Sequence, residues 1–345
     1  MKYLLALILL VVLVGCAVAT PTEVAYEPMR FITPKKTVEP ENTLTQASFS
    51  TLATEPALEL INFEAISTAI PNPFPNQNPY LCRNVDCILD LSLPLQRPIG
   101  LTDRHWIDVG YPYGSTAGNK YAPHHGVEFY NPAGTLVLAA ADGLVIVAGT
   151  DYDESYSDAL AFYGNLVIIE HDIEGFGVPI YTLYGHLLDI SVSVGDSVSA
   201  GDQVGTVGMT GWAIGPHLHF EVRLGENSYY KTDNPALWLS QRISQDGQAL
   251  GSLTGLVIRQ SGVVEIAKSL TLEALDKNGE VNGKKYFFRT YEDPQLYVNA
   301  LLHENFVHAD LPAGDYRLTV VAGKLFERVV SIEPGKITYV FLIIP

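Results

Sequence analysis

The sequence has few cysteines and few basic residues, and both shortages exclude classes of protein. Its 345 residues include 3 Cys, too few for a disulfide-rich scaffold or for a zinc site built of cysteines alone. Lys and Arg number 21 against 38 Asp and Glu, giving a formal net charge of -17. This charge argues against electrostatic binding to nucleic acid or to an anionic membrane face. The length suits two compact modules plus unstructured sequence.

Long helical periodicity is also lacking in residues 93–242. Short apolar runs alternate there with Gly, Asp, Asn and Pro turns, as at Leu136–Leu138 and Val204–Val207. This pattern predicts a mainly antiparallel β domain. A faint repeat of the form Gly-x-x-Val-x-Ala, at 134–139 and 195–200, favours two related hairpin units within it.

The first 19 residues have the pattern of an export signal, with an apolar run from Leu4 to Val14 after a basic start. The segment ending at Cys16 resembles the bacterial lipobox, in which the cysteine becomes the lipidated N-terminus. Ala17-Val18-Ala19 fits an ordinary secretory cleavage site instead, and an uncleaved anchor is a third alternative. Because Cys16 directly follows the apolar core, we favour a lipoprotein at the outer face of the cell membrane over a secreted protein.

The rest of the chain divides by composition. Residues 20–92 are rich in Pro, Thr and Ser and predict an extended tether, in which Cys82 and Cys87 could form a local disulfide outside the cell. Residues 243–253 are a polar linker. Strand-like runs separated by turns then predict an accessory β-sandwich over 254–345, so the whole fold is expected to be all-β.

Residues that can carry chemistry are concentrated in three short segments. Their sequences are Pro123-His-His-Gly-Val-Glu128, Tyr184-Gly-His186 and Pro216-His-Leu-His-Phe-Glu221. In a strand, side chains alternate between faces, so His217, His219 and Glu221 would share one face and the intervening apolar residues would enter a core. Two imidazoles on a rigid strand suit a metal and a base. A polar strand face with incidental histidines is the alternative.

The first segment follows the same period, since His124, Gly126 and Glu128 are evenly spaced. Gly126 has no side chain, which would leave room for an ion. Imidazole nitrogens and carboxylate oxygens both bind zinc at about 2.0–2.2 Å, and two His with one carboxylate leave a fourth position for water, as in catalytic sites. His186 follows a strand-like run, and Gly185 before it permits a sharp turn that could present the ring. His125 would point to the opposite side, so we interpret it as a non-ligand.

The three segments, in this order over about residues 93–242, resemble the lysostaphin-type (LytM-like) zinc endopeptidases, a family of peptidoglycan hydrolases. The resemblance implies a β domain of the duplicated hybrid motif type and one Zn²⁺ ion bound by His124, Glu128 and His219. It also implies that His186 and His217 are the two catalytic histidines. The family usually has Asp where this chain has Glu128, which puts the carboxylate one methylene farther from its backbone.

The expected activity is hydrolysis of peptide bonds in peptidoglycan stem or cross-link peptides. The leading alternative is a catalytically inactive module that binds wall peptide or regulates another hydrolase. Residues 254–345 resemble, around Asp310–Arg317, the immunoglobulin-like or transthyretin-like modules of exported enzymes, and a zinc-loaded adhesion or scaffold protein that uses this module is a third possibility. Release of new amino groups from wall material separates the enzyme from both other possibilities.

Overall fold

The computed structural model of the chain describes residues 86–89, 94–299 and 302–345, all within one compact unit. The expected export signal with Cys16, most of the expected tether and Cys82 lie outside these residues. Cys87 is disulfide-bonded. None of the helices in the described ranges is both long enough and apolar enough to cross a membrane.

The central region, residues 94–242, consists mainly of short strands. They are β2 (Val127–Phe129), β3 (Leu136–Leu138), β4 (Gly143–Thr150), β5 (Asn165–His171), β6 (Ile180–Gly185), β7 (Leu187–Ile190), β8 (Ser197–Val198), β9 (Gln203–Val207), β10 (Leu218–Leu224) and β11 (Thr232–Asp233). Two 3-10 turns flank β11, η2 (Tyr229–Lys231) and η3 (Pro235–Leu237). Every strand pair in this region is antiparallel, which confirms the predicted fold class.

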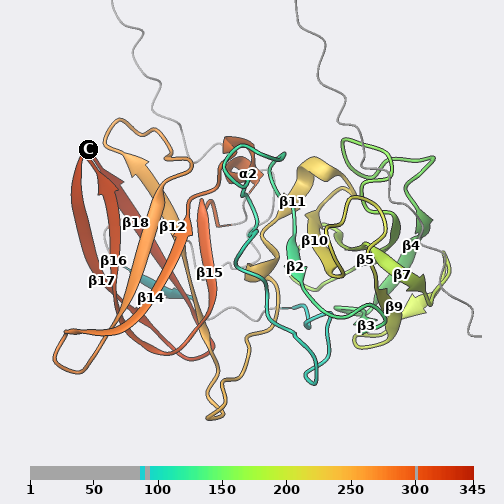
Figure 1. Ribbon diagram of the computed structural model, residues 1–345, viewed down its shortest axis with the longest axis horizontal. Helices are drawn as coiled ribbons and strands as arrows, with labels where there is room; N and C mark the ends of the chain where they lie inside the picture. The colour runs from blue at the N-terminus through green and yellow to red at the C-terminus, as the bar shows by residue number, and fades with distance from the viewer. Residues whose placement is uncertain (1–85, 90–93, 300–301) are drawn as a thin grey trace, which may run out of the picture. The chain divides into compact units, whose positions relative to one another are not determined.

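These strands form two sheets. The larger has the order β11-β10-β6-β5-β4-β8, with β2 also paired to β10, and the smaller has the order β3-β9-β7 (Figure 1). The two segments of the faint sequence repeat contain β3 and β8. β3 pairs with β9 and β8 pairs with β4, so each repeat's first strand pairs with the strand that follows the other repeat.

The larger sheet is buried on both faces, and the alternation of side chains assigns residues to each face. On β5, Val167 and Ile169 belong to the main core, whereas Leu166 and Ile168 belong to a smaller cluster with Tyr163. On β10, Leu218, Phe220, Val222 and Leu224 enter the main core. The polar residues between them therefore face the other side of the sheet, where the smaller cluster lies.

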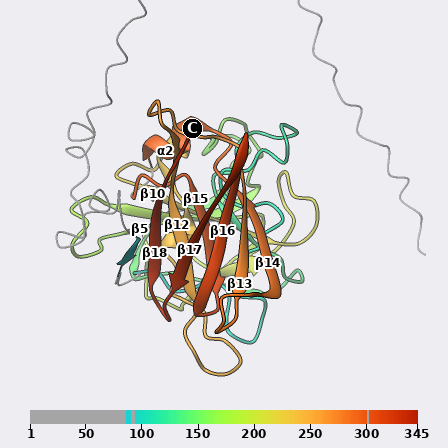
Figure 2. The same cartoon turned by 90° about the vertical axis from the view of Figure 1, so that its left-hand side faces the viewer.

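The remaining strands form two four-stranded sheets, which we call the sandwich. The strands are β1 (Cys87–Leu89), β12 (Gly251–Arg259), β13 (Ser269–Leu275), β14 (Val281–Arg289), β15 (Phe306–Leu311), β16 (Gly314–Ala322), β17 (Lys324–Ile332) and β18 (Ile337–Ile344), with helix α2 (Pro294–Asn299) between β14 and β15. The orders are β1-β18-β12-β15 and β14-β13-β16-β17, and β12 and β18 are parallel. Figure 2 shows these strands in the foreground. Apolar residues from both sheets form a shared core.

The sandwich includes sequence from both sides of the central region. Residues 87–89, within the segment expected to be tether, pair with the last strand, β18. The main core of the central region also includes sandwich residues, among them Leu256, Tyr291 and Tyr339. The two regions therefore share one continuous apolar core.

Candidate metal centre

Strand register brings the three histidine-bearing segments together. On β10, His219 lies opposite Glu128 of β2 on one side and opposite Gly185 of β6 on the other. Directly opposed residues of neighbouring strands have Cβ atoms about 4.5–5.5 Å apart, so their side chains meet. His186 follows Gly185 immediately, and His217 precedes β10. Segments far apart in sequence thus become neighbours across three strands.

Three side-chain atoms converge at this point. His124 Nε2 lies 2.8 Å from Glu128 Oε1, His219 Nδ1 lies 3.0 Å from the same oxygen, and the two nitrogens are 3.3 Å apart. The three residues are buried, and their ligand atoms all lie within 4.8 Å of one another. The longer side chain of Glu128, compared with the Asp usual in the enzymes that the sequence resembles, therefore does not keep its carboxylate away from the two imidazoles.

The donor set fits a zinc ion. Imidazole nitrogens and a carboxylate oxygen are zinc ligands, and ligand atoms around a tetrahedral ion with bonds of about 2.1 Å are roughly 3.4 Å apart. The separations of 2.8–3.3 Å are close to this value. His124 Nδ1 is buried and has no hydrogen-bond partner within the described structure, and the second carboxylate oxygen of Glu128, Oε2, has only an ion-pair contact of 3.1 Å with His217 Nε2. Three possible ligand atoms within 4.8 Å of one another, next to a buried nitrogen without a partner, suit a cation.

Charges within the site favour an ion pair between His219 and Glu128. Burial alone would lower the pKa of His219, but Glu128 and Glu221 raise it to about 9. Burial would likewise raise the pKa of Glu128, but His219 and the hydrogen bond from His124 hold it well below its usual value. Without metal, the site thus keeps a negative carboxylate beside a proton that a cation can replace.

Glu221 orients His219 from the side away from the three converging atoms. Its Oε1 accepts a hydrogen bond from His219 Nε2 at 3.0 Å, which leaves Nδ1 for a metal. Arg223 donates from Nε to Glu221 Oε2 at 2.8 Å, and Tyr163 donates its hydroxyl to Oε1. Burial would raise the pKa of Glu221, but Arg223 and His219 lower it to about 2. A hydrogen bond of this kind fixes the tautomer of a ligand histidine.

Sequence reasoning placed Glu221 on the correct face but gave it no role, and it missed Arg223 and Tyr163. Arg223 was detectable, because it continues the same period-two row of β10. Tyr163 had no local signal, since it is 58 residues away from its partner Glu221.

The role predicted for Gly126 is wrong in its detail. A Cβ atom on Gly126 would lie 2.6 Å from the carbonyl oxygen of Phe220 and 2.7 Å from the ring of His219. The absent side chain therefore makes room for β10 and the His219 ring rather than for an ion.

The strand that carries Glu128 was expected to include His124 as well. Instead, β2 starts at Val127, and His124 lies in the preceding loop.

His186 occupies the sharp turn between β6 and β7. The left-handed residue is His186 itself, with φ of 62°, rather than the glycine before it. Its Nδ1 donates to the carbonyl of Thr210 at 2.8 Å, so Nε2 carries the lone pair of the neutral ring. Burial and the positive charge of His219 lower the pKa of His186 to about 3. Non-glycine residues in this backbone region are held by their surroundings and cluster at functional sites.

His217 completes the group. Its Nδ1 donates to the carbonyl of Gly215 at 2.9 Å, and its Nε2 lies 3.1 Å from Glu128 Oε2. The ring centroids of His217 and His186 are 4.8 Å apart. In both histidines Nδ1 contacts a backbone carbonyl, so Nε2 is the ring nitrogen that points away from that carbonyl. The structure brings together all five residues that the sequence singled out.

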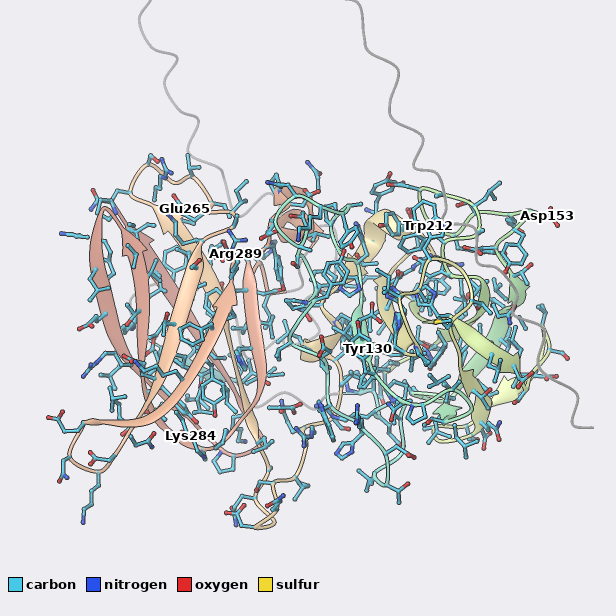
Figure 3. The ribbon with its side chains drawn as sticks, in the orientation of Figure 1. Tyr130, Asp153, Trp212, Glu265, Lys284 and Arg289 are labelled. Carbon is cyan, nitrogen blue, oxygen red and sulfur yellow. The ribbon has the colours of Figure 1, made fainter. Side chains whose placement is uncertain are left out.

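Aromatic side chains surround the five residues. Tyr111 stacks on His124 with ring centroids 4.2 Å apart, and Tyr130 lies 5.2 Å from His217. Tyr130 is 40% exposed and Trp212 is 66% exposed, and Figure 3 shows both on the central region. His125 points elsewhere and bonds Thr232 Oγ1 at 2.9 Å.

The part of the chain that contains this site matches a known protein family. Residues 122–231 match the sequence model of a protein family described as "Peptidase family M23". This range contains all five site residues. The chain is 37% identical over 103 residues to the peptidoglycan DD-endopeptidase ShyA of Vibrio cholerae, covering 30% of this chain and 21% of that protein. It is 39% identical over 113 residues to the glycyl-glycine endopeptidase ALE-1 of Staphylococcus capitis, covering 32% and 26%.

Among solved structures, the chain is similar to the catalytic domain of the antimicrobial peptidase lysostaphin from Staphylococcus simulans. The two are 31% identical, the match covers 38% of this chain and 88% of that one, and the TM-score is 0.30. The chain spans about a quarter of the length of the curated relatives ShyA and ALE-1.

Proposed function

We propose that the protein is a zinc-dependent endopeptidase, because residues 122–231 match peptidase family M23. Its proposed substrates are the stem or cross-link peptides of peptidoglycan, outside the cell, as the names of ShyA and ALE-1 suggest. The observation that carries the proposal is the convergence of His124 Nε2, Glu128 Oε1 and His219 Nδ1 within 4.8 Å.

In this proposal His124, Glu128 and His219 hold one zinc ion. Zinc bound there would supply Lewis-acid chemistry, which polarises a scissile carbonyl and makes water easier to deprotonate. Glu221 keeps the Nδ1 atom of His219 directed at the ion, and Arg223 keeps Glu221 ionised. The protein thus contributes a fixed, buried ligand set.

His186 and His217 handle the protons of the reaction. Each ring has its Nδ1 on a backbone carbonyl, which leaves Nε2 as the nitrogen that can exchange protons, and His217 Nε2 lies 3.1 Å from Glu128 Oε2, beside the ligand set. One ring takes the proton of the attacking water, and the other, once protonated, stabilises the developing oxyanion or the departing amine. General acid-base help of this kind is typically worth about 10²- to 10⁴-fold.

The test is digestion of purified wall material and of defined wall peptides by the full chain, with mass spectrometry of the products. We expect new amino groups and one preferred cleaved bond, loss of both on chelation, and recovery when zinc is added. Binding of wall peptide by the zinc-loaded protein without cleavage would instead support an inactive binding or regulatory module.

We also propose that the protein is exported and is attached to the outer face of the membrane through lipidated Cys16, with residues 20–92 as its tether. In the proposed division, residues 93–242 are the peptidase domain, 243–253 the linker and 254–345 the accessory sandwich. Strand β1 of the tether and the first residues of β12, in the linker, also belong to the sandwich sheet. The lipobox-like sequence and the family's extracellular substrates support attachment. Metabolic lipid labelling of the wild type and of a Cys16→Ser variant tests it, and a soluble mature chain that begins at Thr20 would contradict it.

A further inference from the structure

The loop that precedes His124 fixes both the backbone and the ring of that residue. We call residues 110–121 the ligand loop. Gly114 N donates to the carbonyl of His124 at 2.8 Å, and His124 N donates to the carbonyl of Ser115 at 2.9 Å. Tyr111, on the same loop, stacks on the imidazole at an interplanar angle of 15°. The position of His124 therefore depends on the position of the ligand loop.

The sandwich holds this loop through Glu292. Its Oε2 accepts hydrogen bonds from the backbone N of Thr116 at 2.6 Å and from the Thr116 hydroxyl. Its own backbone N donates to the carbonyl of Gly114 at 2.8 Å. The side chain of Glu292 is 6% exposed, and its second oxygen pairs with Arg289. Hydrogen bonds to a buried carboxylate are about twice as strong as neutral ones.

Packing at this contact is equally close. Tyr291 lies against Gly114, where an added Cβ would be 2.6 Å from the Tyr291 ring. Gly114 has a φ of 78°, a conformation that favours glycine. A side chain at this position would therefore both clash with the Tyr291 ring and strain the backbone. Tyr113 meets Tyr291 edge to face at 5.2 Å. The loop contains no strand. Its other hydrogen bonds close on the loop itself or on the adjacent residues Asp108 and Ala122, apart from the bond between Tyr113 and Thr232.

We propose that Glu292 is a positioning residue for the metal centre: it fixes the ligand loop against the sandwich and thereby holds His124 ready to bind zinc. The inference rests on the proposed function only in taking His124 as a zinc ligand. Ligands held in place before the ion arrives bind it more tightly, and partners outside the ligand set commonly change metal affinity by about 10- to 100-fold. The sandwich is then part of the active site.

The experiment compares Glu292→Ala with Glu265→Ala in the full chain. Glu265 is a matched control, because it lies in the sandwich, is also 6% exposed and is paired with Arg259 and Lys268 (Figure 3). We measure the zinc dissociation constant by competition with a chelator, amide hydrogen exchange over residues 113–124, and thermal unfolding. Glu292→Ala is expected to weaken zinc binding about tenfold and to speed exchange in the ligand loop. Glu265→Ala is expected to change neither.

Wild-type zinc affinity and unchanged exchange in Glu292→Ala would overturn the proposal, as would equal weakening of zinc binding by Glu265→Ala. If Glu292→Ala does not fold, Thr116→Ala decides, because it removes the hydroxyl bond to Glu292 together with the bond that Asn119 N donates to the same hydroxyl: weaker zinc binding supports the proposal and wild-type affinity overturns it. Failure of the proposed function is distinguishable, since it would appear as a wild-type chain that binds zinc but cleaves no wall peptide.

Discussion

His219 Nε2 lies 3.0 Å from Glu221 Oε1. The two residues are two positions apart on β10, and both are buried. The same carboxylate is paired with the buried guanidinium of Arg223, at 2.7 Å from Nη2. Glu221 therefore acts as an acceptor that orients the ring rather than as a fourth ligand, because its two oxygens are engaged by His219 Nε2, Tyr163 and Arg223 on the side of the ring away from Nδ1. This relationship explains how a histidine between two carboxylates presents a defined nitrogen to an ion.

Replacing Glu221 by Gln should weaken zinc binding about 10- to 100-fold, because the charge that fixes the His219 tautomer is lost. Arg223 would keep its charge without an anionic partner, which should lower the free energy of unfolding by about 3–5 kcal/mol. Chelator competition and urea denaturation measure the two effects. Glu170→Gln, at an exposed position of β5, should stay within about 0.5 kcal/mol of the wild type. Unchanged zinc affinity in Glu221→Gln would show that Glu221 has no orienting role.

His219→Ala and His217→Ala should separate metal binding from catalysis. The first removes one of the three converging ligand atoms, so we expect loss of zinc and of activity together. The second leaves all three in place, so we expect wild-type zinc content with turnover reduced by about 10²- to 10⁴-fold, the usual value of general acid-base help. Metal analysis of the purified variants, with kcat on a defined peptide, gives both numbers. Equal zinc loss in the two variants would refute the assignment of ligands.

Zinc binding should release a proton from His219. In the metal-free protein the pKa of His219 is about 9, against an ordinary value of 6.5. Zinc must replace the proton on Nδ1, so affinity should increase as the pH rises towards 9. Calorimetry at about pH 7.5, in buffers with different ionisation enthalpies, counts the protons, and we expect about one. No buffer dependence of the binding enthalpy would contradict the charged state of His219.

Stability of the metal-free protein follows from the same shift. A raised folded-state pKa means that the stabilisation by His219 is complete below its unfolded value of 6.5 and is lost as the pH rises through about 9. Glu221 has a lowered pKa of about 2, so its contribution is present above its unfolded value of 4.5 and is lost as the pH falls towards 2. The pKa of His186 is lowered to about 3, so this buried ring also costs stability as the pH falls below its unfolded value of 6.5. Urea denaturation after chelation should therefore show maximal stability near pH 6.5.

Asp310→Asn tests the contact between the sandwich and the central region. Asp310 accepts a hydrogen bond from the buried guanidinium of Arg97 at 2.8 Å, and its φ of 60° is one that Asn tolerates. Loss of the charge should cost about 3 kcal/mol of unfolding free energy, because Arg97 stays buried. The control is Glu273→Gln, whose partner Lys285 is 49% exposed, and it should cost at most about 1 kcal/mol. Equal costs would show that the Arg97 pair acts as a surface pair.

Much of the central sheet could be predicted because its strands carry strong local signals. The run at Leu136–Leu138 is β3 with the predicted bounds, and the alternation on β10 placed His219 and Glu221 on one face. The wrong detail at Gly126 has a tertiary cause, because the space beside it is filled by His219, which is 93 residues later in the chain. Tyr163 and Glu292 gave no local signal, since their partners lie on other strands and loops.

The sequence by itself determined the residue types and periodicities: which residues could bind zinc, which faces of the strands they occupy and that the chain is built of β-strands. These properties follow from local alternation, which a linear sequence shows directly. Only the tertiary structure decided the register that sets His219 between Glu128 and Gly185, the carboxylate that orients its ring, and the hold of the sandwich on the ligand loop. These depend on contacts between residues far apart in the chain, whose partners are chosen by packing and hydrogen bonding rather than by local pattern.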